Sequence, residues 1–321
     1  MDNPQPSNNT PAWERQTLEK LIFASLEEQK AKRRWGIVFK SLAFAYLFFV
    51  LFAVVDWGGG SEHQERHTAL VNLTGTIEAK GEANAENLIA ALDAAFEEKN
   101  AAGVILRINS PGGSPVQAGM VNDEIRRLRG KYPDKPLYVV VEDMCASGGY
   151  FVAAAADKIF VNKASVVGSI GVLMDGFGFT GTMEKLGVER RLLTAGENKG
   201  FLDPFSPQVD RQKAHAQSLL NSIHLQFIDV VKAGRGKRLK ETPEMFSGLM
   251  WTGEQSIQLG LADDYGSVDS VARDVVQAEK ILDYSVKDNI AERFAKRLGA
   301  GAVSSFWKGF SESALGGAHI R

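Results

Sequence analysis

Short apolar runs alternate with longer stretches of helical periodicity through the middle of the chain. The apolar runs are rich in β-branched residues, which is typical of buried strands. They are residues 67–75, 103–108 and 136–142. Between them, residues 86–99 and 116–129 carry apolar side chains at helical spacing. This alternation predicts an α/β domain with largely buried strands.

The second half of the chain follows a looser version of the same pattern. It predicts a strand at 158–162, a short helix at 182–186, a strand at 190–194 and a long helix at 207–233. We expect one domain over residues 68–285, followed by a helix and a loose tail at 286–321.

A different pattern, continuous rather than alternating, precedes the domain. Residues 41–55 carry no charge, and residues 35–38 extend the apolar stretch past Lys40. Taken over residues 35–57, the stretch has Trp35 and Trp57 where interfacial aromatic residues are favoured. The stretch exceeds the roughly 20 helical residues that cross a bilayer. Because a polar segment precedes it and no small-residue cleavage site follows Val55, we expect a retained transmembrane helix and not a cleaved signal peptide.

The charges on the two sides of this stretch predict its direction. Basic residues precede it at Lys30, Lys32, Arg33 and Arg34, and acidic residues follow at Asp56, Glu62 and Glu65. The positive-inside rule then places residues 1–34 in the cytoplasm and the large domain outside the cytoplasmic membrane. Residues 58–67 read as a flexible tether between the two.

Composition excludes several classes of function. The formal net charge of the 321 residues is −2, so nucleic acid is not an expected partner. The single cysteine, Cys145, cannot form an internal disulfide, and no Cys/His spacing resembles a zinc site. We therefore expect no structural metal and no cofactor.

Three glycine-containing turns follow predicted strands, where α/β proteins collect their functional groups. They are NSPGG at 109–113, CASGG at 145–149 and GSIG at 168–171. Gly-Gly pairs allow several backbone N–H groups to point into one concavity, which is what stabilising an oxyanion requires. A tight turn without chemistry is the competing interpretation of each pair.

Ser147 is the best candidate for a nucleophile, because it lies between a buried strand and a helix-like segment beside two glycines. The histidines are poorly placed to activate it. His63, His67 and His319 fall in the predicted tether and tail, and His215 and His224 lie on opposite sides of one predicted helix. Lys199, in a glycine-flanked loop, can serve as base instead if it is desolvated, although such a lysine is more often solvated.

The motifs NSPGG, ASGGY, VGSIGV and ENKG, in this order, closely resemble the signal peptide peptidase A family in its short bacterial form. The resemblance covers roughly residues 70–266, including WTGEQSIQLGLADDYG. It implies that Ser147 is the nucleophile, Lys199 the general base and Ser169 the residue that orients the lysine. It also implies an oxyanion hole built from Gly112, Gly113 and Gly148.

The same resemblance implies a fold, partners and substrates. The fold would consist of repeated ββα units, as in the Clp protease proteolytic subunit and the crotonases. The chain would form a homo-oligomer whose active sites are shared between neighbouring subunits, and would cleave remnant signal peptides and possibly other membrane or exported peptides. Two alternatives stay open: a crotonase-like acyl-CoA enzyme, which the predicted placement outside the cytoplasm disfavours, and a catalytically silent oligomeric membrane scaffold.

Overall fold

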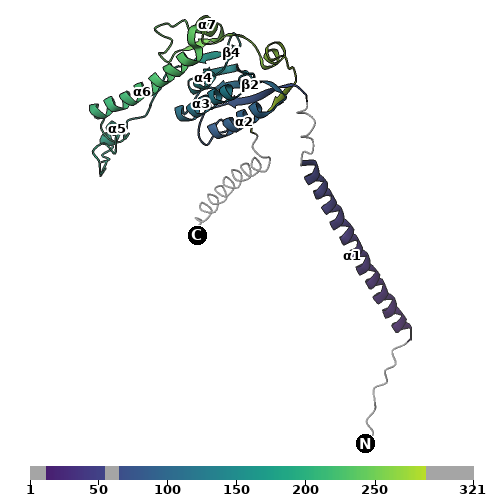
Figure 1. Cartoon of the computed structure of the whole chain (residues 1–321). Coiled ribbons are helices and arrows are strands. Elements are labelled where there is room, and N and C mark those ends of the chain that lie inside the picture. The colour runs from purple at the N-terminus through teal and green to yellow at the C-terminus, as the bar shows by residue number, and fades with distance from the viewer. Residues whose placement is uncertain (1–11, 55–64, 287–321) are drawn as a thin grey trace. The chain divides into compact units, whose positions relative to one another are not determined.

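The computed structural model describes residues 12–54 and 65–286, and the chain divides into two compact units, Met1–Gln64 and Glu65–Arg321 (Figure 1). The described part of the first unit is a single helix, α1 (Ala12–Val54). Within the described residues, no helix is both long enough and apolar enough to span a membrane. The predicted transmembrane segment at 35–57 extends beyond the described residues and stays a prediction. Most of the predicted tether and tail also lie outside them.

The second unit is built on an eight-stranded mixed sheet. The main path runs in the order β6-β5-β3-β2-β1-β8, and β4 pairs with both β3 and β7. All the pairs are parallel except the antiparallel pair β5–β6. The strands are β1 (His67–Thr74), β2 (Ala101–Ser110), β3 (Leu137–Ala146), β4 (Lys158–Val161), β5 (Val166–Gly168), β6 (Met250–Thr252), β7 (Asp264–Tyr265) and β8 (Ile281–Asp283). The predicted α/β class is confirmed.

Helices α2 (Ala85–Glu97), α3 (Pro115–Lys131) and α4 (Gly148–Ala153) pack with the sheet around the main hydrophobic core. Alternate residues of the strands enter this core, among them Leu73, Leu106 and Val141, each at most 2% exposed. A smaller cluster on the other side of the strands contains Ile105 and Val140. It is covered by α8 (Val268–Ser270) and η3 (Val271–Val276). Burial on both faces explains why the strand sequences are almost continuously apolar.

A short second strand is present in the first two strand-to-helix connections, reduced to one residue in each. Ile77 follows β1 and Gly113 follows β2, and the two form an isolated parallel bridge. The N–H of Ile77 donates to the Gly112 carbonyl, and the N–H of Ser114 donates to the Ile77 carbonyl. Strand, bridge and helix therefore follow one another twice in the chain.

Residues 171–220, called the arm here, contain α5 (Thr180–Lys185) and the first part of α6 (Asp210–Arg235). In Figure 1, α6 runs outward from the sheet and α5 lies at its far end. The predicted strand at 190–194 is wrong: these residues pair with no strand in the described part of the chain, and their side chains are exposed. Their apolar character reflects a surface of the arm and not a buried strand.

The other end of α6 is fixed to the main body through close contacts. A Cβ atom added to Gly234 would lie 1.9 Å from the carbonyl oxygen of Ala154, so the two backbones touch there. The rings of Phe227 and Phe151 lie 5.1 Å apart. The chain then continues through η2 (Gly236–Arg238) to α7 (Gly253–Gln258), which begins with a capping box at Thr252 and Gln255.

Candidate active site

Ser147 occupies a strained turn between β3 and α4. Its backbone angles are φ 51° and ψ −122°, a region that residues other than glycine rarely adopt. Such strain costs about 1–3 kcal/mol and is concentrated at functional sites. The N–H of Ser147 donates to the Gly168 carbonyl at 2.8 Å, and the Ser147 carbonyl accepts from Phe151 at 3.0 Å. The turn therefore holds a half-buried serine at the start of a helix.

The turn at Gly112 and Gly113 lies directly against Ser147. The φ angles of the two glycines are +99° and +147°. A Cβ atom on Gly112 would come within 2.6 Å of the Gly148 nitrogen and 2.7 Å of the Ser147 Cβ. Only glycine fits this position, because both the backbone angle and the space exclude a side chain.

The amides of Gly113 and Gly148 lie beside the serine. The Cβ position of Gly148 is 3.2 Å from the Gly113 nitrogen, so the two turns are in contact. In the described part of the chain, neither amide donates to a hydrogen-bond acceptor. Two N–H groups that lie next to a serine hydroxyl and have no acceptor among the described residues are the donors that a developing oxyanion needs.

Ser169 reaches the same region from β5. It directly follows Gly168, the acceptor of the Ser147 N–H, and its own N–H donates to the Leu249 carbonyl at 2.8 Å. The φ angle of Ser169 is 50°, also positive. Two serines with unusual backbone angles therefore lie next to Gly168, one hydrogen-bonded to its carbonyl and one following it in the chain. The structure thus brings together Ser147, Ser169 and the three glycines.

Lys199 lies apart from this group. Its side chain is exposed, and its N–H donates to the Gly196 carbonyl within a turn of the arm. The two preceding residues, Glu197 and Asn198, bind Arg211 in the first turn of α6.

The length of α6 indicates how far Lys199 lies from Ser147 in one chain. α6 reaches the residue after Ser169 at His224, whose Nε2 lies 3.1 Å from the Ile170 carbonyl oxygen. Thirteen residues of helix separate Arg211 from His224, or about 20 Å at 1.5 Å per residue. The turn that carries Lys199 is therefore held far from Ser147 of the same chain.

Neither histidine of α6 contacts Ser147. His215 is exposed, and its ring lies 6.2 Å from that of Phe201 within the arm. His224 is half-buried against Ile170. Within the described residues, no Ser-His-Asp triad is formed around this serine.

Cys145, two residues before Ser147, is fully buried in β3. Burial raises the pKa of its thiol far above the ordinary value, so the sulfur stays neutral. We assign it a packing role in the main core.

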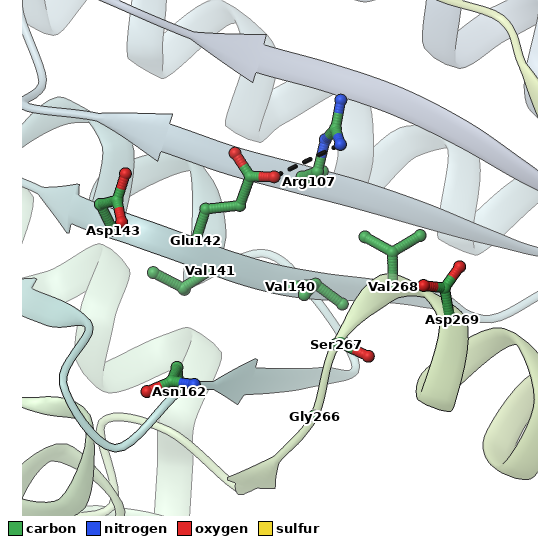
Figure 2. A pocket seen from close by; sticks show the side chains of 10 residues that line it. All are labelled: Arg107, Val140, Val141, Glu142, Asp143, Asn162, Gly266, Ser267, Val268 and Asp269. Carbon is green, nitrogen blue, oxygen red and sulfur yellow. Dashed lines mark ion pairs between the residues drawn. The ribbon is translucent and has the colours of Figure 1, made fainter.

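Two of the cavities in the described part of the domain lie away from Ser147. Figure 2 shows the first, of about 540 Å³, where the Arg107–Glu142 ion pair of β2 and β3 faces Asp269 of α8. The second, of about 770 Å³, lies within the arm between residues 174–180, residues 200–209 and α6. None of the six predicted site residues lines either cavity. Around the half-buried Ser147, Gly113 is exposed whereas Gly112 and Gly148 are buried.

The sequence profile of peptidase family S49 matches residues 130–282, a span that includes Ser147, Ser169 and Lys199. Residues 130–282 therefore form a peptidase S49 domain. The resemblance to the signal peptide peptidase A family is thereby confirmed.

Relatives of this chain include proteins of different overall length. The Na⁺/H⁺ antiporter NhaA of Brucella melitensis is 46% identical over 182 residues, which are 57% of this chain and 25% of that protein. An Enterococcus faecium protein named signal peptide peptidase SppA is 29% identical over 224 residues, 67% of this chain and 64% of that protein. The chain therefore spans a quarter of the first relative and under two thirds of the second.

Among solved structures, the 1510-N membrane-bound stomatin-specific protease, crystallised with a substrate peptide, is similar at 13% identity with a TM-score of 0.45. The match covers 73% of this chain and 98% of that one.

Proposed function

We propose that this chain is a serine endopeptidase whose nucleophile is Ser147 and whose oxyanion hole is formed by the amides of Gly113 and Gly148, with Gly112 shaping the turn. The observation that carries the proposal is that the strained turn at Ser147 packs against the turn formed by Gly112 and Gly113, which has no side chains there. Strain of this kind persists only where the surrounding structure enforces it. The peptidase S49 domain supports the same reaction.

The reaction is acyl transfer through a covalent intermediate. Neutral Lys199 accepts the proton of the Ser147 hydroxyl while the Ser147 oxygen attacks a peptide carbonyl carbon. The tetrahedral oxyanion is stabilised by the amides of Gly113 and Gly148. Lysine then returns the proton to the leaving amine, the C–N bond breaks, and water releases the acyl group with Lys199 again as base.

Lys199 acts in this scheme on the serine of a neighbouring subunit, with Ser169 orienting its side chain. The separation of the Lys199 turn from Ser147 within one chain supports this arrangement. Exposed apolar side chains on the arm support a second copy as partner, because large apolar patches mark interaction surfaces. Leu173 is 83% exposed, Phe177 80% and Leu193 96%. Docking would bury these side chains and desolvate the lysine.

The protein is anchored in the bacterial cytoplasmic membrane by residues 35–57, with the protease domain outside. The apolar sequence and the exposure of Phe44 and Phe49 on α1 favour a lipid environment for this helix. A site close to the membrane surface suits remnant signal peptides and other exported or membrane peptides. The sequence of strand, one-residue bridge and helix supports the ββα fold of the Clp protease subunit and the crotonases.

The proposal is tested by covalent labelling of the full-length protein with a serine-reactive fluorophosphonate. We expect a single labelled residue, identified by peptide mass spectrometry as Ser147. Ser147→Ala should lose all labelling, whereas Ser247→Ala, at an exposed turn, should keep it. No labelling of the wild-type protein would favour the scaffold, and binding of a CoA thioester analogue would favour the crotonase-like enzyme.

A further inference from the structure

Ser110 is a fully buried polar residue at the end of β2, outside the set of predicted site residues. Its hydroxyl donates to the Gly75 carbonyl at 2.6 Å and accepts the Gly112 N–H at 3.1 Å. One side chain thereby joins the loop after β1 to the glycine turn after β2.

The same residue contacts the start of α4. A Cβ atom on Gly149 would lie 3.2 Å from the Ser110 carbonyl oxygen and 3.4 Å from the Ser110 Cβ. A register shift between Ile108 and Ser110 places Ser110 beside Cys145 of β3. Ser110 therefore lies where the glycine turn, the loop after β1 and the helix that follows Ser147 meet.

Two further contacts hold the glycine turn on its outer side. The Gly112 carbonyl accepts the N–H of Ile77, and the N–H of Gly75 donates to the Asn109 carbonyl at 2.9 Å. These contacts use backbone atoms and tolerate sequence change, whereas the inner contact depends on the Ser110 hydroxyl. A serine-to-alanine change would leave the buried Gly112 N–H without its acceptor.

We propose that Ser110 is a positioning residue that sets the direction of the Gly113 amide in the oxyanion hole. This inference rests on the proposed function. The Ser110 hydroxyl fixes the Gly112 N–H and with it the Pro111–Gly112 peptide plane. Through the φ of +99° at Gly112, this orientation is passed to the next peptide plane, which carries the Gly113 N–H. Its contribution is made in the transition state, because the oxyanion exists only there.

The experiment compares Ser110→Ala with wild type in the full-length oligomer. We expect kcat for a peptide substrate to fall by about 10- to 100-fold, less than the loss of a whole oxyanion donor, with KM nearly unchanged. Affinity for a peptide aldehyde, whose serine adduct carries the oxyanion, should fall by a similar factor. Binding of the uncleaved peptide, measured in a Ser147→Ala background with and without Ser110→Ala, should stay within about twofold.

Ser256→Ala is the matched control. Ser256 is also fully buried, and its hydroxyl donates to the Gly253 carbonyl at 2.7 Å, away from the glycine turn. It should lower the melting temperature without lowering kcat or aldehyde affinity. If Ser110→Ala does not fold, Ser110→Cys, which keeps a weak donor and acceptor of similar shape, should show the same kcat and aldehyde losses to a smaller extent.

The inference is overturned if a folded Ser110 variant keeps wild-type kcat and aldehyde affinity, or if it loses peptide binding and kcat to the same degree. Failure of the proposed function has a different signature. In that case the wild-type protein itself would neither cleave peptides nor be labelled at Ser147.

Discussion

The backbone N–H of Ser147 donates to the carbonyl oxygen of Gly168 at 2.8 Å, which ties the turn after β3 to the end of β5. Gly168 has a φ of +111°, and a Cβ atom there would lie 3.0 Å from the Trp251 ring. Gly168 therefore links the two serines, because it accepts the hydrogen bond of Ser147 and directly precedes Ser169.

Gly112→Ala should reduce kcat for peptide cleavage by at least about 100-fold, because the new Cβ would collide with the Gly148 nitrogen and disturb the oxyanion hole. The measurement is steady-state kinetics on full-length protein isolated by size exclusion. Gly119→Ala is the control, since nothing lies within 4 Å of a Cβ at that position of α3. It should keep wild-type turnover and raise stability by about 1 kcal/mol. Normal turnover by Gly112→Ala would remove this turn from the mechanism.

The glycine turns show how far sequence reasoning reaches. The motif NSPGG predicts a turn after a strand, and β2 does end at Ser110. The order of strands and helices up to residue 162 was also predictable, because long buried strands carry a strong apolar signal. The contacts between the glycine turns could not be predicted from the sequence. They depend on backbone distances of a few ångströms between residues far apart in the chain, such as Gly112 and Ser147, which are 35 residues apart.

Gly234→Ala should destabilise the domain by about 1–3 kcal/mol, because the added methyl group would overlap the Ala154 carbonyl oxygen. This contact fixes α6 to the residues that follow α4. The measurement is urea unfolding of the isolated full-length protein. Gly130→Ala, with open space around its Cβ, serves as control and should not destabilise. Equal stability of the two variants would show that α6 can move away from Ala154 at little cost.

Asp263→Asn should destabilise the domain by about 3–5 kcal/mol, because it leaves Arg235 buried without its counter-charge. The Arg235 side chain is 0% exposed and lies 2.9 Å from the Asp263 carboxylate, which is 14% exposed. The measurement is chemical denaturation at neutral pH. Asp264→Asn, at an exposed neighbour, is the control and should change stability by less than about 0.5 kcal/mol.

The ion pair between Arg235 and Asp263 should make the stability of the domain depend on pH. Burial alone would raise the pKa of Asp263. The hydrogen bond and charge of Arg235, together with the Ile159 N–H and the charge of Arg238, outweigh burial and hold that pKa below its ordinary value of 3.8. A lowered carboxyl pKa contributes stability above the unfolded value and loses it as pH falls through the folded value. We expect the wild type to lose stability below about pH 4 more steeply than Asp263→Asn in acid titrations. Parallel curves would contradict the coupling.

The arm is where sequence reasoning failed, and the reason is physical. Residues 190–194 have the composition of a strand but remain exposed, because no strand among residues 12–54 and 65–286 lies beside them. Periodicity reports which side chains avoid water, not whether the surface that covers them belongs to the same chain. Lys199 belongs to the same segment, so neither the sequence nor a single chain explains how it would become desolvated.

Mixed oligomers provide the decisive test of a shared site. Under the proposed scheme, Ser147→Ala and Lys199→Ala homo-oligomers are both inactive, because every site lacks one partner. His215→Ala, a change within the same arm, should keep wild-type turnover and so exclude general damage to the arm.

Co-expression of Ser147→Ala and Lys199→Ala should restore part of the activity. A Lys199→Ala subunit still supplies Ser147, and a neighbouring Ser147→Ala subunit still supplies Lys199, so some interfaces of a mixed assembly contain a complete pair. If both residues acted within one chain, every site in the mixture would still lack a partner, and no mixing ratio would help. The measurement is peptide turnover by assemblies purified through two different tags, one on each variant, so that only mixed oligomers are assayed. Zero turnover by these mixed oligomers would reject the shared site while leaving Ser147 as the nucleophile.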